Sequence, residues 1–165
     1  MSIKQGFLIE MEHETNNTRR ILERVSDEHL SYRPHEKSMS LGDLLGHIVE
    51  LHSWVAEGLT RDSFNLMTDY RPFKPTSVAE IKERLEAAYQ KNVETVNAFD
   101  EEEWSKKWKL HVGDHVISEV PKIGAFRFII HNHLIHHRGQ ATVYLRLLDI
   151  PVPGLYGPSA DEHKK

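Results

Sequence analysis

The sequence predicts an all-α protein, a four-helix bundle with long crossover loops. Four segments of roughly 20 to 25 residues each repeat their apolar side chains with the period of a helix. Prolines and polar clusters separate these segments, so the connections are longer than simple hairpin turns. Long helices with such connections are typical of helical bundles. A chain of 165 residues is the right size for one hydrophobic core, and we expect a single domain over residues 1–165.

The first two helices are predicted from apolar periodicity and from the residues that begin or break them. The first runs from about Ser2 to Val25, with the apolar positions Phe7, Ile9, Met11, Ile21, Leu22 and Val25. The segment SDEHLSYRPHEKSM follows, and its Pro34 cannot continue a helix. The second helix begins near Ser40, where Ser40-Leu41-Gly42-Asp43 resembles a capping box, and continues to about Leu59.

The second half of the chain contains the other two helices, a central segment and a tail. A capping box at residues 77–80 (SVAE) begins the third helix, which reaches about Phe99. The fourth follows Pro121 and ends at about Leu148. Between them, a turn at Gly113-Asp114 predicts a small hairpin near residues 108–118, and we expect no substantial sheet beyond it. The tail IPVPGLYGPSADEHKK cannot be helical, and its apolar side chains predict that it packs back onto the domain.

The composition limits the partners and the chemistry. With 21 Lys and Arg against 25 Asp and Glu, the net charge is −4, so we expect no nucleic-acid partner. The N-terminal segment lacks a continuous apolar stretch, and no window approaches a membrane span, so we expect no membrane partner. The chain has no cysteine, which favours a cytoplasmic location and leaves nitrogen and oxygen as metal ligands.

The stretch HNHLIHHRGQ, residues 131–140, has four histidines within seven positions. On a helical wheel, His133 and His137 lie one turn apart in a predicted inward stripe. This stripe comprises Phe126, Ile130, His133, His137, Ala141, Tyr144 and Leu148. The wheel places His136 on the flank, and it directs His131 and Arg138 away from the core, towards solvent or a partner.

The pair His133 and His137 has the i, i+4 spacing that lets two imidazoles reach one cation. Buried neighbouring imidazoles repel each other when protonated and need partners when neutral, and a divalent metal ion satisfies both requirements. His47, at the edge of the apolar arc of the second helix, is the best-placed third ligand; His52 on the opposite flank is weaker. We expect all three ligand nitrogens about 2.0–2.1 Å from a zinc-like ion. A metal-free, pH-sensitive histidine cluster is the alternative.

Three histidines leave an open coordination position, as in catalytic zinc sites. Gln140 lies near both members of the pair, where it either orients a metal-bound group or binds the neighbouring helix. Glu50, three residues after His47, is a candidate carboxylate partner for that ligand. Arg138 either holds an anionic substrate or forms a surface or interface salt bridge, whereas Tyr144 is assigned to core packing.

The segments LGDLLGHIVELHSW, HLIHHRGQATVYLRLL and PVPGLYGPSADE together resemble the DinB/YfiT-like family over nearly the whole chain. The HxxxHRGQ pattern and the proline-rich tail are the most specific part. The resemblance implies an up-down-down-up four-helix bundle in which three histidines bind a divalent metal ion, and in which dimers are common. Its ligands correspond to His47, His133 and His137. Zinc or nickel is the expected metal, with iron as a further candidate, because imidazole suits all three.

The family name refers to inducibility by DNA damage and implies no DNA binding. Some relatives are transferases or isomerases that depend on bacillithiol, mycothiol or a similar thiol, and many have no assigned activity. The resemblance thus implies a metal-dependent hydrolase or a low-molecular-weight-thiol transferase acting on a small molecule. The alternative is a non-catalytic, metal- or ligand-binding dimeric bundle that serves as a sensor or scaffold. A symmetric homodimer is expected to bury the surplus apolar side chains Trp54, Phe128, Val143 and Leu147.

Overall fold

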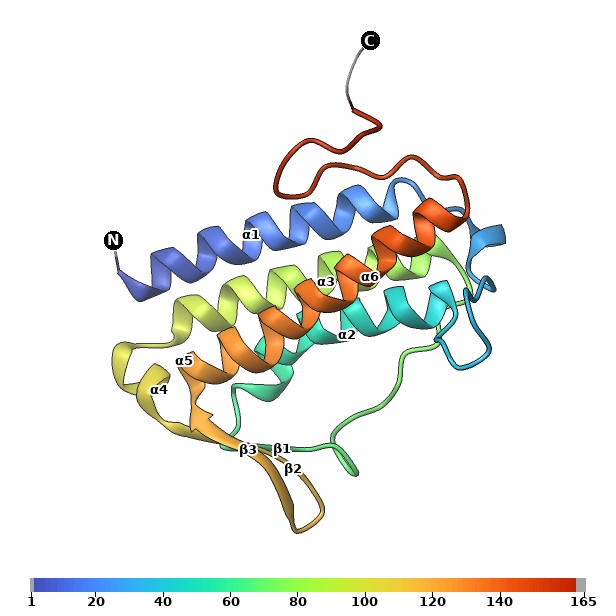
Figure 1. The fold of residues 1–165 in the computed structure, drawn as a ribbon. Coiled ribbons are helices and arrows are strands. Elements are labelled where there is room, and N and C mark those ends of the chain that lie inside the picture. The colour runs from blue at the N-terminus through green and yellow to red at the C-terminus, as the bar shows by residue number, and fades with distance from the viewer. Residues whose placement is uncertain (1, 163–165) are drawn as a thin grey trace.

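Four long helices lie side by side in the computed structural model, which describes residues 2–162 (Figure 1). They are α1 (Ile3–Leu22), α2 (Leu41–Gly58), α3 (Val78–Ala98) and a continuous last helix made of α5 (Lys122–Gly124), a π-helical segment (Ala125–His131) and α6 (Asn132–Leu147). Both α1 and α2 pack against α3 and α6. Within residues 2–162, no helix is long and apolar enough to cross a membrane.

The helix starts lie where serine side chains can cap them. The hydroxyls of Ser2, Ser40 and Ser77 each accept the backbone N–H of the residue three positions later. The predicted starts of the first three helices are therefore confirmed to within a residue. The capping box at Ser77 is incomplete, because the carboxylate of Glu80 accepts the backbone N–H and the hydroxyl of Thr76 instead of the N–H of Ser77.

A small three-stranded sheet lies at one end of the bundle (Figure 1). The predicted hairpin is confirmed: β2 (Lys107–Val112) and β3 (His115–Pro121) are antiparallel around Gly113, which adopts a φ of 54°. The sequence did not indicate the third strand, β1 (Ser63–Asn65), which pairs with β2 in parallel, so the expected all-α class is not confirmed. The protein is therefore mostly helical with a small sheet. A three-residue strand in a polar loop is too short to show an alternating pattern, and the short helix α4 (Glu101–Ser105) was also not expected.

The core is formed by apolar side chains of all four long helices and of the sheet. Trp54 was expected outside the main stripes, but it is 6% exposed and its ring lies 4.9 Å from that of Phe64 in β1. Phe128, Val143 and Leu147 are exposed, as the sequence predicts. The tail packs back onto the domain through the buried Ile150, which confirms that prediction.

The last helix is not a regular α-helix throughout. Within the π-helical segment the hydrogen bonds reach back five residues, and the N–H of Asn132 donates to the carbonyl oxygen of Arg127. His131 is buried, with Nδ1 3.3 Å from a carboxylate oxygen of Glu10. The prediction that His131 faces solvent or a partner was therefore wrong, because His131 and Arg138, seven positions apart, point in nearly the same direction and the face that they share is buried.

The prediction that Arg138 lies outside the core was also wrong. Its side chain is fully buried and donates hydrogen bonds to the Glu14 carboxylate, the Thr18 hydroxyl and the hydroxyl of Tyr156 in the tail. Consequently the most buried stripe of α6 is Leu134, Arg138, Ala141 and Leu145, and the two inward histidines flank it. A charged side chain was assigned to the surface because its buried counter-ion on α1 is remote in sequence.

Candidate metal centre

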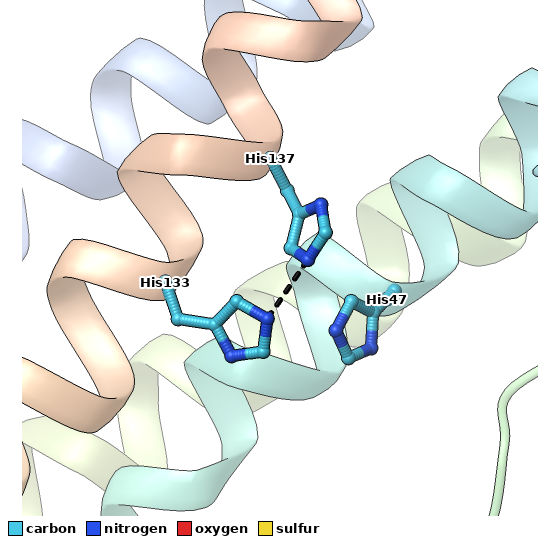
Figure 2. A group of neighbouring side chains, drawn as sticks. All are labelled: His47, His133 and His137. Carbon is cyan, nitrogen blue, oxygen red and sulfur yellow. Dashed lines mark hydrogen bonds between the residues drawn. The ribbon is translucent and has the colours of Figure 1, made fainter. Parts of the chain in front are cut away.

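His47 from α2 converges with His133 and His137 from α6 between these two helices (Figure 2). One ring nitrogen from each histidine lies within 4.8 Å of the other two. The Nε2 atoms of His133 and His137 are 2.8 Å apart, and the His47 ring centroid is 5.2 and 4.8 Å from those of the pair. We refer to these three residues, which are the ones selected from the sequence, as the histidine cluster.

Two polar side chains, Glu50 and Gln140, form hydrogen bonds with the Nδ1 atoms of His47 and His137 in the histidine cluster. The Nδ1 of His47 lies 3.0 Å from a carboxylate oxygen of Glu50, and the Nδ1 of His137 lies 2.7 Å from the amide oxygen of Gln140. Because both partner atoms are acceptors, each Nδ1 carries the proton and each Nε2 keeps its lone pair. This arrangement, in which the far ring nitrogen is hydrogen-bonded, is typical of metal-binding histidines.

Glu50 also connects the histidine cluster to the loop that follows β1. Its buried carboxylate accepts the hydroxyl of Tyr70 at 2.8 Å and the backbone N–H of Phe73. Burial and the bond to Glu50 raise the pKa of Tyr70, so its hydroxyl stays protonated as the donor. The loop approaches α2 so closely that a Cβ at Gly46 would lie 2.9 Å from the carbonyl oxygen of Phe73. The sequence indicated Glu50, but no local pattern indicated its partners in the loop.

Burial keeps the imidazoles of His133 and His137 neutral at neutral pH. Burial lowers the pKa of His133 to about 4, and the neighbouring His137 and His47 contribute to the same shift. Burial also lowers the pKa of His137, against a smaller opposing effect of its hydrogen bond with Gln140. At neutral pH these two side chains therefore have a lone pair available without losing a proton, which favours metal binding.

The other histidines considered above lie outside the cluster. His136 is exposed, and its Nε2 lies 3.1 Å from the amide nitrogen of Gln140. His52 is buried on another face of α2 and bonds the Thr18 hydroxyl at 3.0 Å, in agreement with its weaker ranking as a ligand. His131 is paired with Glu10.

The donor set fits a divalent metal ion. Metal–nitrogen bonds of about 2.0–2.1 Å separate two ligand nitrogens on the same ion by roughly 3–4 Å, which is the scale of the histidine cluster. Imidazoles are good ligands for zinc, nickel and iron, and the hydrogen bonds at Nδ1 of His47 and His137 leave Nε2 as the ligand atom of each ring.

A helical bundle with three half-buried histidines between two of its helices defines a class of proteins with a candidate metal site. Residues 1–164 match the DinB family, and the chain belongs to this family. It is 27% identical over 159 residues to the uncharacterized protein YrdA of Bacillus subtilis (strain 168), covering 96% of this chain and 91% of YrdA.

Two solved structures share the fold. A DinB-like protein from Bacillus cereus ATCC 10987 matches with a TM-score of 0.72 and 26% identity, covering 92% of this chain and 97% of that one. The DinB-like protein YjoA from Bacillus subtilis matches with a TM-score of 0.68 and 21% identity, covering 86% and 91% of the two chains. The family predicted from the HxxxHRGQ pattern and the tail is thus confirmed.

Proposed function

We propose that this protein binds one divalent metal ion through His47, His133 and His137 and acts on a small molecule at that ion. The observation that carries the proposal is the convergence of three half-buried imidazoles, two of them oriented by Glu50 and Gln140. Zinc or nickel is the metal we favour, and iron is also suited to this donor set.

His47, His133 and His137 would hold the ion, and a bound divalent ion would supply the acidity that turns a water or a thiol into a nucleophile at neutral pH. The protein contributes the orientation of the ligands. Glu50 fixes the ring of His47, and Gln140 fixes the ring of His137. The reaction class we propose is metal-dependent hydrolysis with water, or transfer to a low-molecular-weight thiol.

A second candidate function is a non-catalytic metal-binding dimer that works as a sensor or scaffold. It is favoured by the exposed apolar side chains Phe128, Val143 and Leu147 along the last helix, which are 69%, 56% and 55% exposed. A symmetric homodimer would remove these side chains from water. The measurement is the solution mass by light scattering, and a monomer at micromolar concentration would contradict the dimer.

Metal binding is tested on protein purified without a nickel column. We expect elemental analysis to find about one divalent ion per chain, and cobalt substitution to produce visible absorption bands. The double variant His133→Ala/His137→Ala should lose both signals, because two of three ligands are removed. His136→Ala is the matched control, since His136 is adjacent in sequence but outside the histidine cluster. Equal metal content in the double variant and the wild type would refute the site.

Catalysis is tested separately on the metal-loaded protein, with simple esters and amides and with thiol conjugation. Turnover in the wild type that is lost in the double variant supports the enzyme. Stoichiometric metal binding without turnover, combined with a dimeric mass, supports the sensor or scaffold instead.

A further inference from the structure

A pocket adjoins the histidine cluster on the side that faces the end of α6. His137 itself lines this pocket, which has a volume of about 380 Å³. Leu44 on α2 lies three residues before His47, and Tyr144 lies seven residues after His137. At a rise of about 1.5 Å per residue, the pocket therefore starts within one helical turn of the ligands. We refer to it as the apolar pocket.

The walls of the apolar pocket are uncharged. Leu44 and Tyr144 are buried at its base, and Met39 and Val143 are exposed at 38% and 56%. Apart from His137 of the histidine cluster, the lining has no ionisable side chain other than the phenol of Tyr144. A carboxylate or phosphate group placed here would be desolvated without a cation to compensate it.

Two polar side chains of the lining, Tyr144 and Gln140, already have partners within the protein. The hydroxyl of Tyr144 donates to the carbonyl oxygen of Met39 at 3.0 Å, so this residue presents its ring to the pocket. Gln140 accepts from His137 with its amide oxygen and contacts His136 with its amide nitrogen. The walls therefore offer apolar surface more than hydrogen-bonding groups.

The guanidinium of Arg33, at the edge of the apolar pocket, is also engaged. Arg33 donates to the carbonyl oxygen of Ser38, another lining residue, at 2.7 Å. Its guanidinium is paired with Asp43 at 3.5 Å, and Asp43 is also bound by Lys74 at 2.7 Å. An anion at this edge would have to compete with a carboxylate that is already in place.

We infer that the small molecule bound at the proposed metal ion carries an uncharged alkyl or aryl group next to its metal-binding atom, and that this group occupies the apolar pocket. This inference rests on the proposed function, because it takes the histidine cluster to be the metal site. The substrate class is a small organic molecule of this kind. A thiol that places a carboxylate in the apolar pocket is disfavoured, because the residues that line the pocket provide no cation for it.

The test uses the cobalt-loaded full chain and two thiols that differ by one carboxylate, phenylmethanethiol and 4-(sulfanylmethyl)benzoate. Binding is followed by the sulfur-to-cobalt charge-transfer absorption. We expect phenylmethanethiol to bind about tenfold more tightly or better, because the carboxylate of the other thiol would be desolvated in the apolar pocket. Val143→Asp should weaken phenylmethanethiol binding about tenfold for the same reason.

Leu147→Asp is the matched control, because Leu147 lies one turn further along α6, is 55% exposed and does not line the apolar pocket. It would affect a dimer contact on this face in the same way as Val143→Asp, but should leave thiol affinity unchanged. If both thiols bind equally, or if the two variants behave alike, the inference is overturned while the metal site stands. If the wild type gives no cobalt absorption, the proposed function itself fails.

Discussion

The ion pair between Arg138 on α6 and Glu14 on α1 is buried, and its loss should destabilise the fold strongly. Only 1% and 7% of the two side-chain surfaces are exposed. The guanidinium also donates to the backbone carbonyl oxygen of Glu14 at 2.8 Å and to the hydroxyl of Thr18 at 3.3 Å. Arg138→Met removes the cation and leaves the Glu14 carboxylate buried without a counter-ion. Breaking a buried pair in this way costs about 3–5 kcal/mol of unfolding free energy.

A more exposed ion pair, between Arg19 on α1 and Glu86 on α3, provides the matched control. Arg19 donates two hydrogen bonds to Glu86, but 29% and 49% of these side chains are exposed. Such pairs contribute about 0–1 kcal/mol, because water screens the charges. Methionine has nearly the same helix propensity as arginine, so Arg19→Met should cost little. The expected difference between the two variants is therefore at least about 2 kcal/mol.

The assay is urea unfolding at pH 7, followed by circular dichroism, with EDTA present so that metal binding does not alter the stability. Arg138→Met should lower the midpoint with an unchanged slope. The melting temperature should fall by about 6–20 °C, from about 2–4 °C per kcal/mol for a chain of this size. The double variant Glu14→Leu/Arg138→Met should recover much of the loss, because no unpaired charge remains. If Arg138→Met costs no more than Arg19→Met, the ion pair does not hold α6 as described.

Three further predictions concern other parts of the structure. Glu50→Gln should weaken metal affinity about 10–100-fold, because the carboxylate that orients His47 is lost; competition with a chelator measures this, and an unchanged affinity would contradict it. Gly46→Ala should lower the urea midpoint, because the new Cβ would lie 2.9 Å from the carbonyl oxygen of Phe73 in the loop. Gly139→Ala adds a Cβ that meets open space and should stabilise the helix by about 1 kcal/mol. Equal effects of the two substitutions would contradict the close packing of the loop on α2. Burial, with the charges of His131 and Arg138, lowers the pKa of His52 well below 6.5. The unfolded chain therefore takes up a proton at this position near pH 6.5 while the folded chain does not, so stability is complete above pH 6.5 and falls as the pH drops below it. Between pH 7.5 and 5, the urea midpoint of His52→Asn should fall less steeply with decreasing pH than that of the wild type. The same pH dependence in both proteins would contradict the contribution of His52.

Local features of the sequence were sufficient for most of the fold. The serine caps and the apolar periodicity located the first three helices, since both signals depend on neighbours within a few residues. The i, i+4 spacing of His133 and His137 is equally local, and His47 was found as the best-placed histidine of the second helix. The HxxxHRGQ pattern and the tail indicated the family that residues 1–164 match.

The errors have non-local causes. Arg138 was placed outside because Glu14, its counter-ion, is 124 positions earlier in the chain. The parallel partner of β2 is a three-residue strand whose pairing depends on tertiary packing. Glu50 was noted as a neighbour of His47, but its bonds to Tyr70 and Phe73 depend on the path of a loop, for which no periodic signal exists.

The π-helical segment has a consequence for the length of the last helix. In a regular α-helix, Phe126 and His137 would point within roughly 20° of the same direction. A π turn holds about one extra residue, which rotates one direction by roughly 100° against the other and leaves them roughly 80° apart. Phe126 can therefore stack on Phe7 of α1, with ring centroids 4.0 Å apart, while His137 faces His47 of α2. Deleting one residue here, such as the exposed Phe128, would replace the π turn by a regular α-helix and keep both directions, because ten α-helical steps also separate them by roughly 80°. The same deletion within α6 would rotate one part of the helix against the other by roughly 100°, so the π-helical segment should be the part of the last helix that best tolerates the loss of a residue.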